Sequence, residues 1–321
     1  MRSIVIDQVQ TVTKPHSSYR HEAFLWRDLD DFLAGTVPFI KDGLAAEEPV
    51  MVAVIEPRAA MIREALGKDD ADRVMFVDMA ELGRNPAKII PAWREFLDAE
   101  SSAGRPLRGI GEPIWAGRRP EEILECQLHE ALLNIAVDPD TPFWLVCPYD
   151  TGGLPPVVIE EAHRSHPAIF DADGYRGSAA YAGRPHIDVI FATELPPLAG
   201  PFEEITFTAD DTQGLSMFVA VRAHAAGLTA EKAAALAVAV HELAQSSLHR
   251  GSASGVVRIS CQQHAVICDV QDETRISDPL TGRRPTAADQ RKGLAFANQV
   301  CDLVQLRSTS TGTTVRVHHW I

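Results

Sequence analysis

The pattern of apolar residues changes once along the chain, at a proline-rich stretch over residues 195–201. Before this stretch, short apolar runs such as 50–55 and 143–147 alternate with segments of helical periodicity. After it come two long alanine-rich helical segments over 215–225 and 230–249, and strand-like runs follow them. A chain of 321 residues is also longer than most chains that fold around a single hydrophobic core. The sequence therefore predicts two domains of different architecture.

The first half predicts an α/β domain with a mostly parallel sheet. Apolar runs at 50–55, 74–77 and 143–147 are bounded by polar turns, which is typical of strands buried on both faces. Because helical segments separate these runs, we expect parallel strands joined by helices.

The second half predicts an α+β two-layer sandwich, with helices on one face of a mixed sheet. Strand-like runs lie at 256–261, 265–270 and 313–319, and a further helix is predicted over 294–303. The last run alternates cleanly between apolar and polar residues, as a half-buried strand does. We expect domains at 18–175 and 203–321, joined by a linker over 176–202.

Charge and cysteine content narrow the class of protein. The formal net charge of −14 argues against binding to nucleic acid or an anionic membrane, and it suits a basic protein partner. No apolar run approaches the length of a membrane-spanning helix, and the N-terminus lacks the apolar core of a signal peptide. Five scattered cysteines without a CxxC pair favour reduced thiols and a cytoplasmic location.

The helical segment over 230–249 carries the most informative motif. Glu242 and Ser246 are four residues apart and so share a helix face, and Gly251 follows shortly after. This block resembles the N-box of the GHKL ATPases, in their anti-sigma-factor branch. The resemblance implies a general base at Glu242 and places Ser246 where the family has an asparagine that holds Mg²⁺.

Further blocks continue the resemblance over about 120 residues. Asp272 matches the family's adenine-binding aspartate, and Thr274 stands where the family has a glycine. Gly293 and Leu294 match the glycine-rich turn that presents backbone N–H groups to phosphates, and Thr313 matches the start of the last strand. Ala295 replaces a second glycine of that turn.

Three departures from the family, at Ser246, Thr274 and Ala295, fall on the expected metal, base and phosphate contacts. We therefore expect a degenerate nucleotide site, and a domain that acts by holding a sigma factor or an antagonist of an anti-sigma factor. The alternative is an active serine/threonine protein kinase with ATP and Mg²⁺ as cofactors and Glu242 as the base. Dimerisation is common in that branch, so a homodimer is an expectation that rests on resemblance alone.

The first half resembles the MEDS sensory domain, which is related to RecA-like P-loop proteins and is proposed to detect small hydrocarbon-like molecules. The resemblance rests on four blocks, at 21–31, 108–115, 125–130 and 147–150. No GxxxxGK[ST] motif occurs in the sequence, so binding of nucleotide in the P-loop manner is not expected. The resemblance implies a small-molecule sensor.

Polar residues of these blocks are candidates for a sensory-ligand pocket, since ligands of parallel sheets bind beyond the carboxyl ends of strands. The candidates are His21, Glu112, Glu125, His129 and Tyr149. Two alternatives stay open. A metal could be held by His21, Cys126, His129 and a carboxylate, although no metal site is expected in the leading interpretation. A metabolic enzyme could use Glu112, Glu125 and His129, although no cofactor motif accompanies them.

Overall fold

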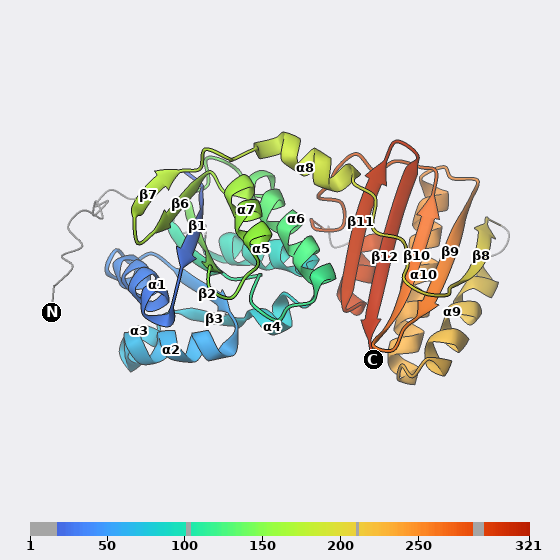
Figure 1. Cartoon of the computed structure of the whole chain (residues 1–321), viewed down its shortest axis with the longest axis horizontal. Helices are drawn as coiled ribbons and strands as arrows, with labels where there is room; N and C mark the ends of the chain where they lie inside the picture. Colours follow the sequence, from blue (N-terminus) through green and yellow to red (C-terminus); the bar gives the residue numbers. More distant parts are fainter. Residues whose placement is uncertain (1–17, 101–103, 210–211, 285–291) are drawn as a thin grey trace. The chain divides into compact units, whose positions relative to one another are not determined.

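The computed structural model of the chain describes residues 18–100, 104–209, 212–284 and 292–321. The chain divides into two compact units (Figure 1). The first contains the described residues up to Leu82 together with Ala92–His186, and the second contains Gly83–Pro91 and Ile187–Ile321. The predicted linker over 176–202 includes helix α8 (Gly183–Ala192), and the two units divide within this helix.

The first unit is built on a seven-stranded sheet in the order β3-β2-β4-β5-β1-β6-β7. Every pairing is parallel except the hairpin of β6 with β7, so the predicted mostly parallel α/β sheet is confirmed. The strands are β1 (Arg20–Trp26), β2 (Val50–Val54), β3 (Met75–Asp78), β4 (Leu107–Gly111), β5 (Phe143–Asp150), β6 (Ala168–Asp171) and β7 (Gly174–Gly177).

Helices cover both faces of this sheet (Figure 1). Phe24, Val52 and Val146 point to one face, where they form a core with Phe32 of α1 and Ile62 of α2. Alternate residues of the same strands face α5, α6 and α7. The helices are α1 (Leu29–Ala45), α2 (Glu56–Leu66), α3 (Lys68–Ala71), α4 (Met79–Leu82), α5 (Ile89–Glu100), α6 (Pro120–Ala136) and α7 (Pro156–Ser165). The 3-10 turn η1 (Pro86–Lys88) and the first turn of α5 belong to the second unit.

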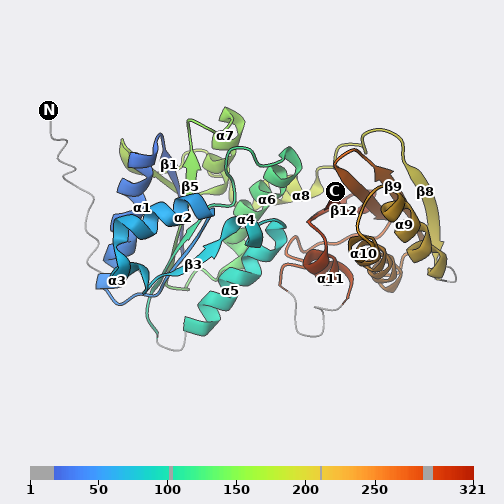
Figure 2. The same ribbon diagram turned by 90° about the horizontal axis from the view of Figure 1, so that it is seen from below.

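The second unit is a five-stranded sheet in the order β11-β12-β10-β9-β8 with helices α9, α10 and α11 on one face (Figure 2). The predicted sheet was mixed, but all four pairings are antiparallel. The elements are β8 (Glu203–Thr208), α9 (Gln213–Ala225), α10 (Ala230–His249), β9 (Ser254–Cys261), β10 (Ala265–Asp272), α11 (Gly293–Val300), β11 (Leu303–Thr309) and β12 (Gly312–Trp320).

Two further expectations are corrected by the structure. The helix predicted over 294–303 ends at Val300, because Cys301 is extended and the Asp302 carboxylate accepts the Trp320 N–H at 2.9 Å, which starts the β11–β12 pairing. Strand β1 was not predicted, because His21 and Glu22 interrupt its apolar pattern although both side chains are buried. Among the described residues, none of the helices combines the length and apolar character that crossing a bilayer requires.

Substitution of Gly109 by alanine should destabilise the first unit. A methyl group at this position of β4 would lie 2.9 Å from ring atoms of both Trp93 and Phe143, in a core that cannot expand freely. We expect a loss of about 1–3 kcal/mol in the free energy of unfolding, measured by urea denaturation. Gly177→Ala is the matched control, since nothing lies within 4 Å of its added methyl group, and an equal loss in both variants would contradict the packing argument.

Candidate functional site

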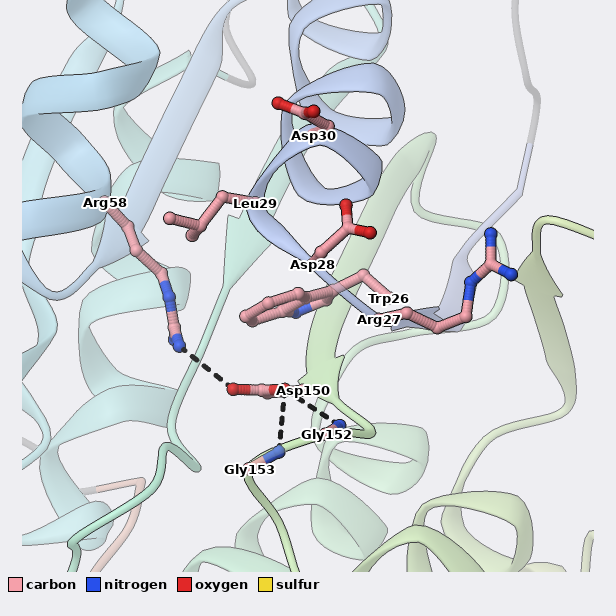
Figure 3. A pocket seen from close by; sticks show the side chains of 9 residues that line it. All are labelled: Trp26, Arg27, Asp28, Leu29, Asp30, Arg58, Asp150, Gly152 and Gly153. Carbon is pink, nitrogen blue, oxygen red and sulfur yellow. Dashed lines mark hydrogen bonds and ion pairs between the residues drawn. The ribbon is translucent and has the colours of Figure 1, made fainter.

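A pocket of about 610 Å³ lies at the carboxyl ends of β1 and β5 in the first unit (Figure 3). These two strands are neighbours in the middle of the parallel sheet and end together, at Trp26 and Asp150. The pocket is lined by Trp26, Arg27, Asp28, Leu29, Asp30, Arg58, Asp150, Gly152 and Gly153. Its position is the one at which parallel sheets usually bind ligands.

Acidic side chains already satisfy the backbone N–H groups around this pocket. The Asp28 side chain caps α1 by accepting the Asp31 N–H at 2.9 Å. The Asp150 carboxylate accepts the N–H groups of Gly152 and Gly153, at 3.0 and 2.9 Å. A phosphate would therefore meet carboxylates where a phosphate-binding loop offers free N–H groups, so the pocket suits ligands other than nucleotides.

Arg58 supplies the positive charge of the pocket. Its guanidinium lies 4.8 Å from the centre of the Trp26 ring, forms an ion pair with the buried Glu112, and lies 3.9 Å from Asp150. Burial lowers the pKa of Arg58 from its ordinary value, and nearby Asp150 opposes this effect. Glu112 Oε2 has no hydrogen-bond partner among the described residues. Together with the Trp26 ring, these groups form a pocket with an apolar wall and a charged, hydrogen-bonding rim.

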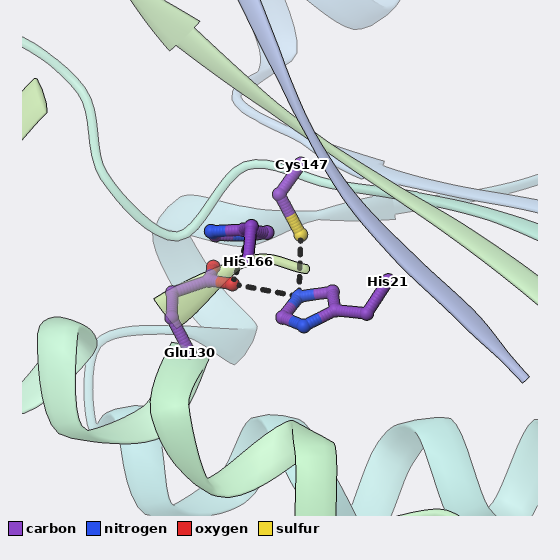
Figure 4. A group of neighbouring side chains, drawn as sticks. All are labelled: His21, Glu130, Cys147 and His166. Atoms are coloured by element: carbon purple, nitrogen blue, oxygen red, sulfur yellow. Dashed lines mark hydrogen bonds and ion pairs between the residues drawn. The ribbon is translucent and has the colours of Figure 1, made fainter. Parts of the chain in front are cut away.

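A second group of polar side chains is buried beneath α6 and α7, closer to the middle of the same two strands (Figure 4). His21 of β1, Cys147 of β5, Glu130 of α6 and His166, which follows α7, place their ligand-type atoms within 4.8 Å of one another. Glu130 Oε2 lies 3.1 Å from Nε2 of both His21 and His166, and Cys147 Sγ lies 3.4 Å from His21 Nε2. None of the four residues exposes more than 3% of its surface.

The environment sets the charge of each member of this cluster. Burial alone would raise the pKa of Glu130, but contacts with His166 and His21 outweigh burial and hold that pKa well below its usual range. Burial, together with neighbouring His166, lowers the pKa of His21. Burial also raises the pKa of the Cys147 thiol, and Glu130 adds to this effect.

The five sequence-predicted sensory residues do not come together in one site, and none of them lines the pocket. The rings of His21 and Tyr149 both pack against His166, with centroids 4.2 and 5.6 Å away. Glu112 instead pairs with Arg58 near the pocket. Glu125 and His129 are buried on α6.

The alternative metal site is not assembled as a group. Cys126 donates its S–H to the Pro113 carbonyl at 3.3 Å. Among the described residues, the one cluster with ligand geometry includes His21 but neither Cys126 nor His129. The cluster that does form contains Glu130, Cys147 and His166 in their place.

The predicted nucleotide residues of the second unit lie together, and Arg250 joins them. Its guanidinium donates to Ser246 Oγ at 3.0 Å, to Thr274 Oγ1 at 3.1 Å and to Asp272 Oδ2 at 2.8 Å. Asp272 also accepts the Thr274 N–H at 2.7 Å. The Asp272 side chain is only 3% exposed. The residue expected to bind adenine is thus fully engaged by its own chain.

The remaining predicted residues are also engaged internally. Glu242 Oε2 accepts the Gly293 N–H at 3.3 Å, and Gly293 has a φ of +52° with Ser246 against it. Leu294 packs partly buried against the apolar core. Thr313 donates its hydroxyl to the Thr274 carbonyl at 2.7 Å.

Several of these residues were missed in the sequence. Glu130 and Cys147 lie inside the blocks that carry the family resemblance, and Arg250, four residues after Ser246, is the C-cap residue of the helix that carries it, so spacing could have identified them. Arg58 lies four residues after the end of β2, at the sheet edge where ligands bind. No local pattern marks His166, which depends on how α7 returns to the sheet.

Comparison with known proteins identifies the first unit. Residues 20–167 match the family model described as MEDS, the MEthanogen/methylotroph, DcmR Sensory domain. This part of the chain is a MEDS domain. The match covers a little under half of the chain and confirms the resemblance predicted for it. The search of curated proteins found no match.

One similar solved structure is that of the RsbU and RsbW domains of Rv1364c from Mycobacterium tuberculosis. Its sequence identity with this chain is 16% and its TM-score is 0.29. The similarity covers 37% of this chain and 32% of that chain, so this chain spans about a third of the other's length. A likeness at this level supports no argument about fold or function.

Removal of the Glu112 carboxylate should destabilise the MEDS domain. Glu112→Ala leaves the Arg58 guanidinium, which is 11% exposed, without its closest counter-charge. We expect a loss of about 3 kcal/mol in the free energy of unfolding, measured by urea denaturation. Glu56→Ala breaks the exposed ion pair with Arg63 and should cost less than about 1 kcal/mol. Equal losses of unfolding free energy in the two variants would contradict the prediction that burial makes the Arg58–Glu112 ion pair more important for stability than the exposed pair.

Proposed function

We propose that the chain is a two-part signalling regulator. Its MEDS domain senses a small molecule, and its second unit binds a sigma factor or an antagonist of an anti-sigma factor by protein contact, without using ATP. The observation that carries the second part of this proposal is the position of Arg250, whose guanidinium bonds to Ser246, Asp272 and Thr274.

Arg250 competes with adenine for the same hydrogen-bonding groups. An adenine amino group would need an acceptor oxygen of Asp272, and both oxygens already accept hydrogen bonds, from Arg250 and from Thr274. A nucleotide would have to break a charge-assisted contact to a buried carboxylate before making its own, and such contacts contribute about 1.5–3 kcal/mol each. ATP binding should therefore be weak.

The phosphate and metal positions are unfavourable for a related reason. The Gly293 N–H at the start of α11 would be needed for a phosphate, yet it donates to Glu242. A carboxylate at this helix N-terminus repels a polyphosphate. Ser246, in place of the family's metal-binding asparagine, accepts a hydrogen bond from Arg250 at 3.0 Å rather than facing an open site. Glu242, the residue expected to act as a catalytic base, thus accepts a backbone hydrogen bond within its own chain.

The sensory role rests on the MEDS match and on the pocket at the ends of β1 and β5. The pocket presents the Trp26 ring beside the Arg58 and Asp150 charges (Figure 3). This combination suits a small molecule with an apolar part and at least one polar group.

The class of protein partner rests on the order of the motifs from Glu242 to Thr313, which resembles the anti-sigma-factor branch. The net charge of −14 is consistent with a basic partner surface. An active serine/threonine kinase is the rival function. It would require ATP and Mg²⁺ to displace Arg250 and Glu242 from their present contacts.

The ATP prediction is tested by calorimetric titration of the full-length protein with ATP and Mg²⁺. We expect a dissociation constant weaker than about 1 mM for the natural sequence. The triple variant Ser246→Asn, Arg250→Ala, Thr274→Gly removes the competing guanidinium and restores the family's residues. It should bind ATP at least about tenfold more tightly, which corresponds to about 1.4 kcal/mol.

Arg222→Ala is the control for loss of an arginine elsewhere in the second unit, since Arg222 pairs with the exposed Glu203. It should leave ATP binding unchanged. Micromolar binding of ATP by the natural sequence, or phosphate transfer to a partner serine, would support the kinase and reject the proposal.

The sensory prediction is tested by filling the pocket. Leu29 lines it and is 46% exposed, so Leu29→Trp should occupy the pocket without disturbing the core. We expect native mass spectrometry to find a small molecule on the natural sequence and at least a tenfold lower occupancy on this variant. Val157→Trp, at an exposed valine of α7 outside the pocket, should keep the molecule. Equal occupancy in all three proteins would place the sensed ligand elsewhere.

A further inference from the structure

The buried cluster of His21, Glu130, Cys147 and His166 has the dimensions of a metal site (Figure 4). Zinc bonds of about 2.0–2.3 Å to nitrogen, oxygen and sulfur in a tetrahedron place neighbouring ligand atoms about 3.3–3.6 Å apart. Glu130 Oε2 lies 3.1 Å from Nε2 of each histidine, Cys147 Sγ lies 3.4 Å from His21 Nε2, and all four ligand atoms lie within 4.8 Å of one another. Only small side-chain shifts are needed to form such a tetrahedron.

Hydrogen bonds outside the cluster fix the orientation of the His21 ring. The Asn134 side-chain N–H₂ donates to the Ser165 carbonyl at 2.7 Å and to the Ala131 carbonyl at 3.1 Å. Asn134 Oδ1 therefore faces His21 Nδ1, at 3.2 Å, as an acceptor. His21 must carry its proton on Nδ1, and in its neutral form it directs the bare lone pair of Nε2 into the cluster.

A hydrogen bond outside the cluster also fixes the orientation of the His166 ring. Its Nδ1 lies 2.9 Å from the Ala162 carbonyl oxygen, which can only accept, so the ring carries a proton there. Its Nε2 then points to Glu130 and has no hydrogen-bond geometry with any described residue. Hydrogen bonds from Nδ1 to a carbonyl or amide oxygen are the usual way in which proteins orient histidine ligands of a metal.

The result is a buried site in which ligand-type atoms converge. Two imidazole nitrogens and a carboxylate point at the same space, and Glu130 Oε1 accepts no hydrogen bond from the described residues. No described lysine or arginine pairs with Glu130, whose partners are His21 and His166. A cation between these groups would satisfy their lone pairs together.

The geometry points to a zinc(II) site in the MEDS domain, with His21 Nε2, His166 Nε2, Cys147 Sγ and one Glu130 oxygen as its four ligands. Two imidazoles, a thiolate and a carboxylate are zinc ligands, and four protein ligands close the tetrahedron. Because the cluster is fully buried, no position remains for water or substrate, so the metal is structural. Binding converts the Cys147 thiol to a thiolate and releases one proton to solvent.

A closed site here would tie four parts of the domain together. His21 lies on β1, Cys147 on the neighbouring β5, Glu130 on α6, and His166 between α7 and β6. Zinc would hold the two helices against the face of the sheet whose strand ends form the pocket. This inference does not depend on the function proposed for the second unit.

Metal content tests the site directly. Tag-free, full-length protein from zinc-supplemented cells should contain about one zinc ion per chain after dialysis against a weak chelator. Cys147→Ser and His166→Ala should each retain at least tenfold less zinc under the same dialysis. Cys126→Ser is the matched control, because Cys126 is an equally buried thiol bonded to the Pro113 carbonyl outside the cluster, and it should keep its zinc.

The visible spectrum of cobalt(II) bound to the natural sequence is a second measurement of the site. It does not depend on whether the variants fold. Cobalt in the natural sequence should show the intense visible bands of a tetrahedral ion and a thiolate charge-transfer band, and Cys126→Ser should preserve both. A weak, octahedral spectrum without the thiolate band would overturn the proposal. So would the absence of zinc from the natural sequence, or equal zinc content in the natural sequence, Cys147→Ser and His166→Ala.

Discussion

The Glu130 carboxylate is the constraint on which the arrangement of the MEDS domain depends. A charge with almost no exposure to solvent must be compensated where it stands, and the two nearest groups are the imidazoles of His21 and His166. Helix α6, strand β1 and the residue after α7 meet at this point. A bound zinc ion would place a full positive charge between these groups.

The cluster and the pocket share a scaffold. Strand β1 carries His21 near its start and Trp26 at its end, while β5 carries Cys147 in its middle and Asp150 at its end. Contacts in the cluster that fix the register of β1 and β5 therefore also fix the positions of Trp26 and Asp150, the pocket residues at the ends of these strands. A rigid sheet edge of this kind suits a binding site whose ligand is small, since displacements of an ångström would change its few contacts.

The second unit also contains a buried carboxylate, and an arginine compensates its charge. Asp272 is nearly as buried as Glu130, and its counter-charge is the Arg250 guanidinium from the neighbouring helix α10. Ser246 and Thr274 also accept hydrogen bonds from this guanidinium, so the chain itself engages these polar groups.

The sequence predicted the coarse architecture well, because strand and helix patterns in the buried core obey simple periods. Strand β1 escaped detection because His21 and Glu22 interrupt its apolar pattern inside a central strand. The antiparallel sheet of the second unit could not be separated from a mixed one, since apolar alternation does not encode strand direction. A family resemblance singled out Glu242, Ser246 and Asp272 as a nucleotide site, which stays a prediction, and Arg250 was added only when the structure showed the direction of its side chain.

His166 illustrates a different limit. Its role arises from three segments that are far apart in sequence, and no motif links it to His21 or Glu130.

The claim that these residues hold a metal is tested most directly by X-ray absorption at the zinc edge on the purified full-length protein. The account predicts a four-coordinate shell with one sulfur at about 2.3 Å and three nitrogen or oxygen ligands at about 2.0–2.2 Å. A six-coordinate shell without sulfur, or no zinc absorption edge, would contradict it.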